Sequence, residues 1–109
     1  GAYNCAVYLS DLQRHAEARS LLRKTIPVAR RVLGESHELT LRMRWICAVA
    51  RCKITGATLD DLREAATTLE ETERTARRVL GSAHPLTKII ERNLRIVQDL
   101  VNRQGLSKK

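Results

Sequence analysis

The residues of this sequence that could ligate a metal ion or act as nucleophiles are its three cysteines and three histidines. Cys47 and Cys52 are five residues apart, which on a helix separates their side chains by about 140°, too far around to hold one ion together. His15, His37 and His84 lie far apart in the chain, and we expect them to be spread along the molecule. These patterns predict no catalytic residue, no metal site and no cofactor. The odd number of cysteines argues against a disulfide framework and favours a reducing, cytoplasmic compartment.

Charge is the second chemical signal. The chain has 20 Lys and Arg against 12 Asp and Glu, a net charge of +8, with an isoelectric point of about 10.1. The excess is uneven: six basic residues and one acid, Glu17, lie between Arg14 and Leu33. The next stretch carries Arg42, Arg44, Arg51 and Lys53 against Glu38. One interpretation is a set of solvated helix faces; the other is an electropositive surface that attracts acidic peptides, nucleic acid or anionic lipid.

Nucleic-acid binding is the alternative function that the charge suggests. A basic isoelectric point fits it. Single-strand binders, however, usually stack bases on aromatic side chains, and this chain has only Tyr3, Tyr8 and Trp45 for that purpose. We therefore place nucleic acid second, behind a protein or peptide partner, which the charge suggests is acidic.

The elements that carry these residues are predicted by an internal repeat. The block 29–34 leads to His37, and it returns 47 residues later as the block 76–81 leading to His84. An earlier block, 4–7, aligns with 46–49 at an offset of 42, so the basic period is 42 with about five residues inserted near 53–57. A period of this length is typical of arrays with two helices per unit. We expect a partial unit over 1–33, a full unit over 34–80 and a half unit over 81–105.

Hydrophobic spacing and capping residues predict five helices and no strand. We expect them at about 2–11, 15–33, 38–54, 59–80 and 84–105, with a frayed tail over 106–109. Ser36 or His37 is expected to cap the third helix, and Thr58 with Asp61 reads as a capping box for the fourth. The buried face of the second helix is predicted to hold Ala18, Leu21, Leu22, Ile26, Ala29, Val32 and Leu33. No apolar stretch approaches the ~18 residues that a membrane span needs.

The last unit carries a recognisable motif. It reads Leu80-Gly81-Ser82-Ala83-His84-Pro85-Leu86-Thr87, with Asn93-Leu94 nine residues after the histidine. This motif resembles the 42-residue tetratricopeptide repeat of the kinesin light chain type. The middle unit keeps Leu33-Gly34, His37 and Thr40 but has Glu38 and Ile46 where the motif has Pro and Asn.

The resemblance implies an all-α, right-handed superhelical stack of antiparallel helix pairs, here in the order A-B-A-B-A. It also implies a non-enzymatic scaffold that binds a peptide or partner segment in a concave groove lined by the A helices. The motif Asn is implied to face the groove and bond a peptide backbone, a role that would fall to Asn4 and Asn93. The expected groove residues are Asn4, Tyr8, Arg42, Ile46, Val49, Ile89 and Asn93, with Arg42 offering charge to an acidic segment.

The fifth predicted helix is apolar on more than one face. Because the chain opens inside a first helix and stops after another, we expect a fragment of a longer array. We further expect self-association through the terminal helices, where apolar side chains would otherwise stay exposed.

Overall fold

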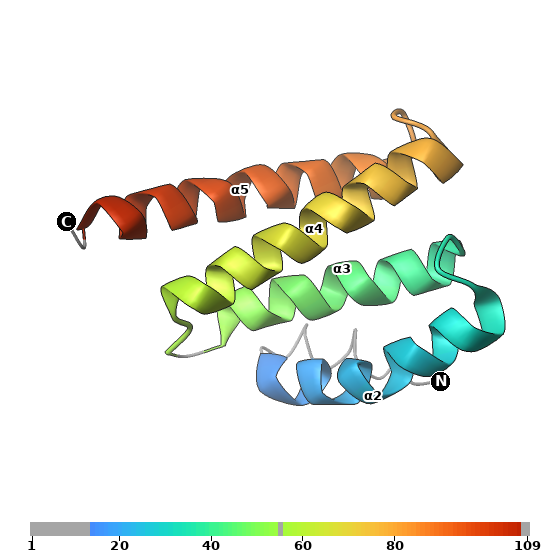
Figure 1. Cartoon of the computed structure of the whole chain (residues 1–109), viewed down its shortest axis with the longest axis horizontal. Coiled ribbons are helices and arrows are strands. Elements are labelled where there is room, and N and C mark those ends of the chain that lie inside the picture. The colour runs from blue at the N-terminus through green and yellow to red at the C-terminus, as the bar shows by residue number, and fades with distance from the viewer. Residues whose placement is uncertain (1–13, 55, 108–109) are drawn as a thin grey trace.

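The computed structural model describes residues 14–54 and 56–107, and this part of the chain forms four α-helices and no strand. They are α2 (His15–Leu33), α3 (Glu38–Lys53), α4 (Leu59–Leu80) and α5 (Pro85–Ser107). Helices that follow one another in the chain pack side by side and run in opposite directions, and α3 also contacts α5 (Figure 1). The helix predicted over 2–11, with Asn4 and Tyr8, lies outside the described residues.

The two corners that follow α2 and α4 are built alike, because the repeated sequence blocks supply the same residues. Gly34 and Gly81 have φ values of 94° and 96°, in a region that glycine enters without steric cost. Each glycine N–H donates to the carbonyl four residues earlier, at 3.1 Å in both corners. His37 Nδ1 then accepts a hydrogen bond from the N–H two residues on, and His84 Nδ1 does the same. Of the two residues predicted to cap α3, Ser36 and His37, the structure shows that His37 is the cap.

The start of α4 confirms the predicted capping box. Thr58 Oγ1 accepts from the Asp61 N–H at 3.1 Å, and the Thr58 N–H donates to Asp61 Oδ2 at 2.9 Å. These reciprocal bonds satisfy two backbone donors that the first turn of a helix leaves without partners. The chain therefore enters α4 in a fixed direction.

Two apolar clusters hold the helices together. The cluster between α2 and α3 contains Ala18, Leu22, Ala29, Met43 and Ile46. The cluster shared by α3, α4 and α5 contains Leu41, Ala48, Ala65, Ala66, Leu69, Ala76, Leu86, Ile90 and Val97. Leu22, which was predicted on the buried face of α2, is fully buried, and so is Leu69 of α4. The many alanines let neighbouring helices approach closely, and the larger side chains fill the space between them.

The last turn of α2 differs from the prediction. Val32 and Leu33 were expected on its buried face, but their exposed fractions are 72% and 40%. Helical spacing puts both residues on the same face as the buried side chains of α2. However, α2 ends at Leu33, and the corner at Gly34 turns the chain towards α3. No other described segment covers this turn.

The end of α5 is also later than predicted. The helix was expected to stop near Gln104 and Gly105, leaving a frayed tail, but it continues to Ser107. A glycine ends a helix readily when it adopts a positive φ, as Gly34 and Gly81 do. Gly105 does not have a positive φ and stays within the helix.

Candidate functional site

A hollow between α3 and α5 is the candidate binding site. It has a volume of about 250 Å³ and is lined by Val49, Cys52, Lys53, Asn93, Ile96, Val97 and Leu100. Most of these side chains are apolar, and Asn93 and Lys53 add an amide and a positive charge. Ile96 is 53% exposed, so an apolar side chain of the wall is accessible to a partner. The hollow therefore combines apolar contact area with a few polar groups, as binding sites commonly do.

Asn93 is held in place within this hollow by α3. The indole Nε1–H of Trp45 donates a hydrogen bond to Asn93 Oδ1 at 2.8 Å. Since the indole is a donor only, this bond assigns the carbonyl end of the amide to Trp45. Asn93 Nδ2 has no hydrogen-bond partner in the part of the chain that the structure describes. The NH₂ group can therefore donate to a ligand.

The predicted groove residues occupy different positions. Val49 and Asn93 lie together in the hollow. Ile89 is half-buried against the core of α3, α4 and α5, and Ile46 is buried in the cluster between α2 and α3. Arg42 is bonded through its Nε to Glu38 Oε2 at 3.2 Å, one turn earlier in α3. The structure does not place these last three side chains in the hollow. Asn4 and Tyr8 lie outside the described residues.

Several lining residues were not identified from the sequence. Ile96, Val97 and Leu100 follow Asn93 at three, four and seven positions, which places all four on one face of α5. That spacing was visible in the sequence and could have extended the predicted groove from Asn93 along the helix. Nothing in the sequence indicated that Lys53 lines the hollow, because its place there depends on where α3 ends relative to α5.

The cysteines of α3 are free thiols. Burial is the main cause that raises the pKa of Cys52 above its usual value of 9.0, and burial likewise raises the pKa of Cys47. A thiol with a raised pKa stays neutral near pH 7 and is a poor nucleophile. Cys52 therefore contributes apolar lining to the hollow.

The positive charges of α3 are largely compensated by α4. Arg44 is buried, and its Nη2 lies 3.0 Å from Glu71 Oε2. Arg51 pairs with Asp61 at 3.1 Å and also with Glu64. A count along α3 alone suggested an uncompensated basic surface, because the acidic partners come from a different helix.

Residues 14–54 and 56–107 contain neither a candidate metal site nor a candidate membrane span. Within these ranges no group of three or more His, Cys, Asp or Glu side chains is placed to hold a metal ion. None of the described helices combines the length and the apolar character required to cross a membrane.

Comparison with known proteins gives one match. The family model described as tetratricopeptide repeat matches residues 3–38, which include α2 and the corner that follows it. No curated protein and no solved structure matches the chain. The family match and the all-helical described part of the chain together support a tetratricopeptide repeat protein.

Proposed function

We propose that this chain is a non-enzymatic protein-interaction scaffold that binds a partner segment in a groove between its A helices. Tetratricopeptide repeats are generally protein–protein interaction modules, which supports the class of function. The observation that carries the proposal is the position of Asn93 in the hollow between α3 and α5. Its NH₂ group can donate to a backbone carbonyl while Val49 and Ile96 contact an aliphatic side chain of the same segment.

The finer form of the proposal follows the kinesin light chain type of repeat. In this form of the proposal, the chain belongs to a cytoplasmic protein and forms five helices in a right-handed superhelix. The helices are divided into units 1–33, 34–80 and 81–105. The groove would also include Asn4, Tyr8, Arg42, Ile46 and Ile89. Lys53 at the hollow favours an acidic partner segment.

The test uses peptides selected on the intact chain from a random display library. Ile96→Asp should reduce the affinity of a selected peptide at least tenfold, because a carboxylate replaces an apolar contact in the wall. Val32→Asp is the matched control, since Val32 is 72% exposed on α2, outside the hollow, and undergoes the same change. Fluorescence anisotropy measures both affinities, and circular dichroism checks that both variants are folded. Equal affinities for the two variants, or a peptide that crosslinks only to α2 and α4, would contradict the groove.

Nucleic-acid binding is the competing proposal, and the net charge of +8 favours it. Counterion release makes such binding fall steeply with salt concentration. A salt titration with single-stranded and duplex DNA, run beside the selected peptide, separates the two functions. Tighter binding of DNA than of peptide at physiological salt would favour the nucleic-acid function.

Self-association through α5 is a separate proposal. Ile96 and Leu106 are large apolar side chains exposed on this helix. Sedimentation equilibrium should show a concentration-dependent dimer that Leu106→Asp weakens. A monomer at the highest concentrations would contradict it.

A further inference from the structure

A second cavity, bounded by α2, α3 and α4, gathers three guanidinium groups. Its volume is about 350 Å³, and its lining includes Arg19, Arg23, Cys47, Arg51, Glu64 and Thr68. It shares no lining residue with the hollow between α3 and α5. Anything that binds here therefore uses a different surface from the proposed peptide groove.

The three arginines are not equivalent. Arg51 is held by carboxylates of α4, with its Nη2 3.1 Å from Asp61 Oδ1 and a second ion pair to Glu64. Arg19 and Arg23 have no ion pair or hydrogen bond from their side chains within the described residues. The cavity therefore has one arginine fixed by carboxylates, among them Glu64 of the cavity's own lining, and two arginines whose side chains have no ion pair within the described residues.

Cys47 lines the same cavity as the three arginines. Burial raises the pKa of its thiol, and the charges of Arg19, Arg23 and Arg51 each act in the opposite direction. These contributions come from two helices and agree with the place of all three arginines in the lining of the cavity that holds Cys47. An anion in this cavity would meet the same field.

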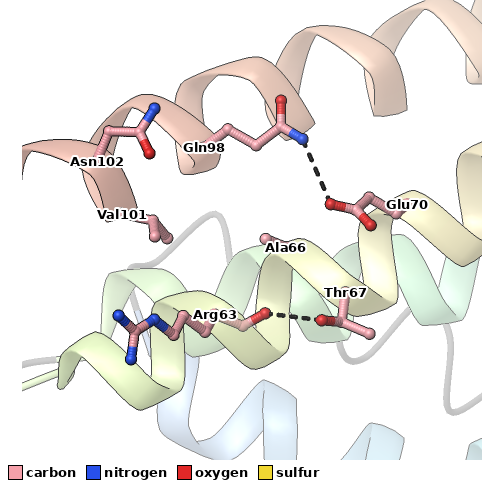
Figure 2. Close-up of a pocket in the computed structure, with 7 residues that line it drawn as sticks. All are labelled: Arg63, Ala66, Thr67, Glu70, Gln98, Val101 and Asn102. Atoms are coloured by element: carbon pink, nitrogen blue, oxygen red, sulfur yellow. Dashed lines mark hydrogen bonds between the residues drawn. The ribbon is translucent and has the colours of Figure 1, made fainter. Parts of the chain in front are cut away.

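The internal repeat provides a comparison within the same chain. Ala66, Glu70 and Gln98 lie 47 positions after Arg19, Arg23 and Arg51, and all three line a cavity of about 340 Å³ between α4 and α5. Figure 2 shows this repeat-related cavity, in which Gln98 Nε2 donates to Glu70 Oε1 at 3.4 Å. The fold therefore forms such a cavity without arginine at these positions. Packing does not explain why the cavity beside α2 has three.

We propose that the cavity between α2, α3 and α4 binds one phosphate monoester carried by a partner protein, with Arg19 and Arg23 contacting the phosphate oxygens. The charges of these two arginines match that of a phosphate monoester, which is close to −2 at neutral pH. The planar guanidinium can donate two parallel hydrogen bonds to such a group.

A single phosphate fits the arrangement better than a nucleic-acid backbone. A backbone needs a continuous basic track, because its affinity comes from neutralising many phosphates. The repeat-related cavity next along the stack has Ala66, Glu70 and Gln98 at the three arginine positions. Its lining contains one cation, Arg63, and one carboxylate, Glu70. The three clustered arginines are therefore confined to one cavity.

The first test compares two double variants of the intact chain. The ligands are phenyl phosphate and a short peptide with one phosphoserine, titrated against ¹⁵N-labelled protein, with the unphosphorylated peptide as reference. Arg19→Gln with Arg23→Gln should weaken binding of both phosphate ligands at least tenfold. Lys24→Gln with Arg31→Gln removes the same charge from the same helix at exposed positions that do not line the cavity, and should change binding less than twofold.

A second measurement does not depend on the arginine variants folding. In a chain carrying Cys5→Ser and Cys52→Ser, Cys47 is the remaining thiol. Saturating phosphoserine peptide should slow its alkylation by iodoacetamide several-fold, and the unphosphorylated peptide should not. Absence of protection would overturn the proposal.

Other outcomes also overturn it. Equal weakening in the two double variants would mean a diffuse charge effect, and non-saturating shifts would mean that no site exists. Tighter binding of a ten-residue oligothymidylate than of the phosphopeptide, with a steep salt dependence, would assign the arginines to nucleic acid. Ile96→Asp should leave phosphate binding unchanged, so failure of the peptide groove can be distinguished from failure of this site.

Discussion

The indole of Trp45 on α3 donates a 2.8 Å hydrogen bond to the side-chain carbonyl of Asn93 on α5. This bond connects two helices that are separated in the chain by the whole of α4. It orients the Asn93 amide, so that its NH₂ group faces away from the bond already made and can serve a ligand. The same residue thus links the two walls of the hollow and contributes to its surface.

Asn93→Ala should lower the free energy of unfolding by about 1 kcal/mol, the usual net value of one such hydrogen bond. Urea unfolding measures the change, and Trp45, the only tryptophan, provides the fluorescence signal. Asn102→Ala is the matched control, because Asn102 is exposed on the same helix and has no side-chain hydrogen bond within the described residues. Both variants replace Asn with Ala in the same helix, so both gain the higher helix propensity of alanine. Equal free energies of unfolding for the two variants would therefore show that the Trp45 bond contributes nothing.

Leu69→Ala should cost about 2–5 kcal/mol, because Leu69 is fully buried among α3, α4 and α5 and its removal leaves a cavity. Leu106→Ala makes the same chemical change at a side chain that is 68% exposed, and should cost less than about 0.5 kcal/mol. Chemical denaturation of both variants gives the comparison. A small loss for Leu69→Ala would mean that the core of the stack is wrongly assigned.

Local signals predicted most of the fold. The bounds of α2 match the prediction, and the capping box at Thr58 gives the start of α4, because caps and helical periodicity depend on residues within one turn of each other. The errors occur in the last turns of α2 and α5, where residue type and spacing do not show which segments cover the helix or where it stops. Val32 fits the periodicity of α2 but is exposed, and Gly105 looks like a stop but remains helical.

The candidate site was harder to predict, because it depends on how separate helices are rotated against each other. Val49 and Asn93 lie in one hollow, but nothing in their spacing shows that Trp45 bonds to Asn93. Charge shows the same difficulty. Arg44 counts as a surface cation along α3, yet it is buried and paired with Glu71 of α4.

Asp61 should make the stability of the chain dependent on acid pH. The backbone N–H of Thr58, followed by the Arg51 side chain, stabilises the carboxylate and holds the pKa of Asp61 below its usual value of 3.8. The group binds its proton more weakly in the folded state, so its contribution is fully present above the unfolded pKa and is lost as the pH falls through the folded value.

Thermal unfolding of the parent chain and of Asp61→Asn, measured from about pH 6 down to about pH 2, tests this expectation. The parent should melt at the higher temperature near pH 6, and the difference should narrow once the pH falls below 3.8. Asp60→Asn, one residue away and largely exposed, is the control and should show less pH dependence. A difference in melting temperature that stays constant across the range would rule out a contribution from the Asp61 carboxylate.

The two corner histidines should contribute unequally to stability. Both accept a hydrogen bond at Nδ1 from the first turn of the helix that follows, so replacing either with alanine removes a cap of the size of about 1 kcal/mol. His84 has a second contact, because its Nε2 lies 3.2 Å from Glu38 Oε1 at the start of α3. His84→Ala should therefore lower the free energy of unfolding more than His37→Ala does.

Glu38→Gln isolates the second contact of His84. With Gln at position 38 the contact to His84 loses its charge, so His84→Ala in that background should cost less than it does in the parent. Urea unfolding of the four chains gives the coupling between the two positions as a double-mutant cycle. An equal cost in both backgrounds would mean that His84 acts only as the cap of α5, and that the two corners of the repeat are energetically independent.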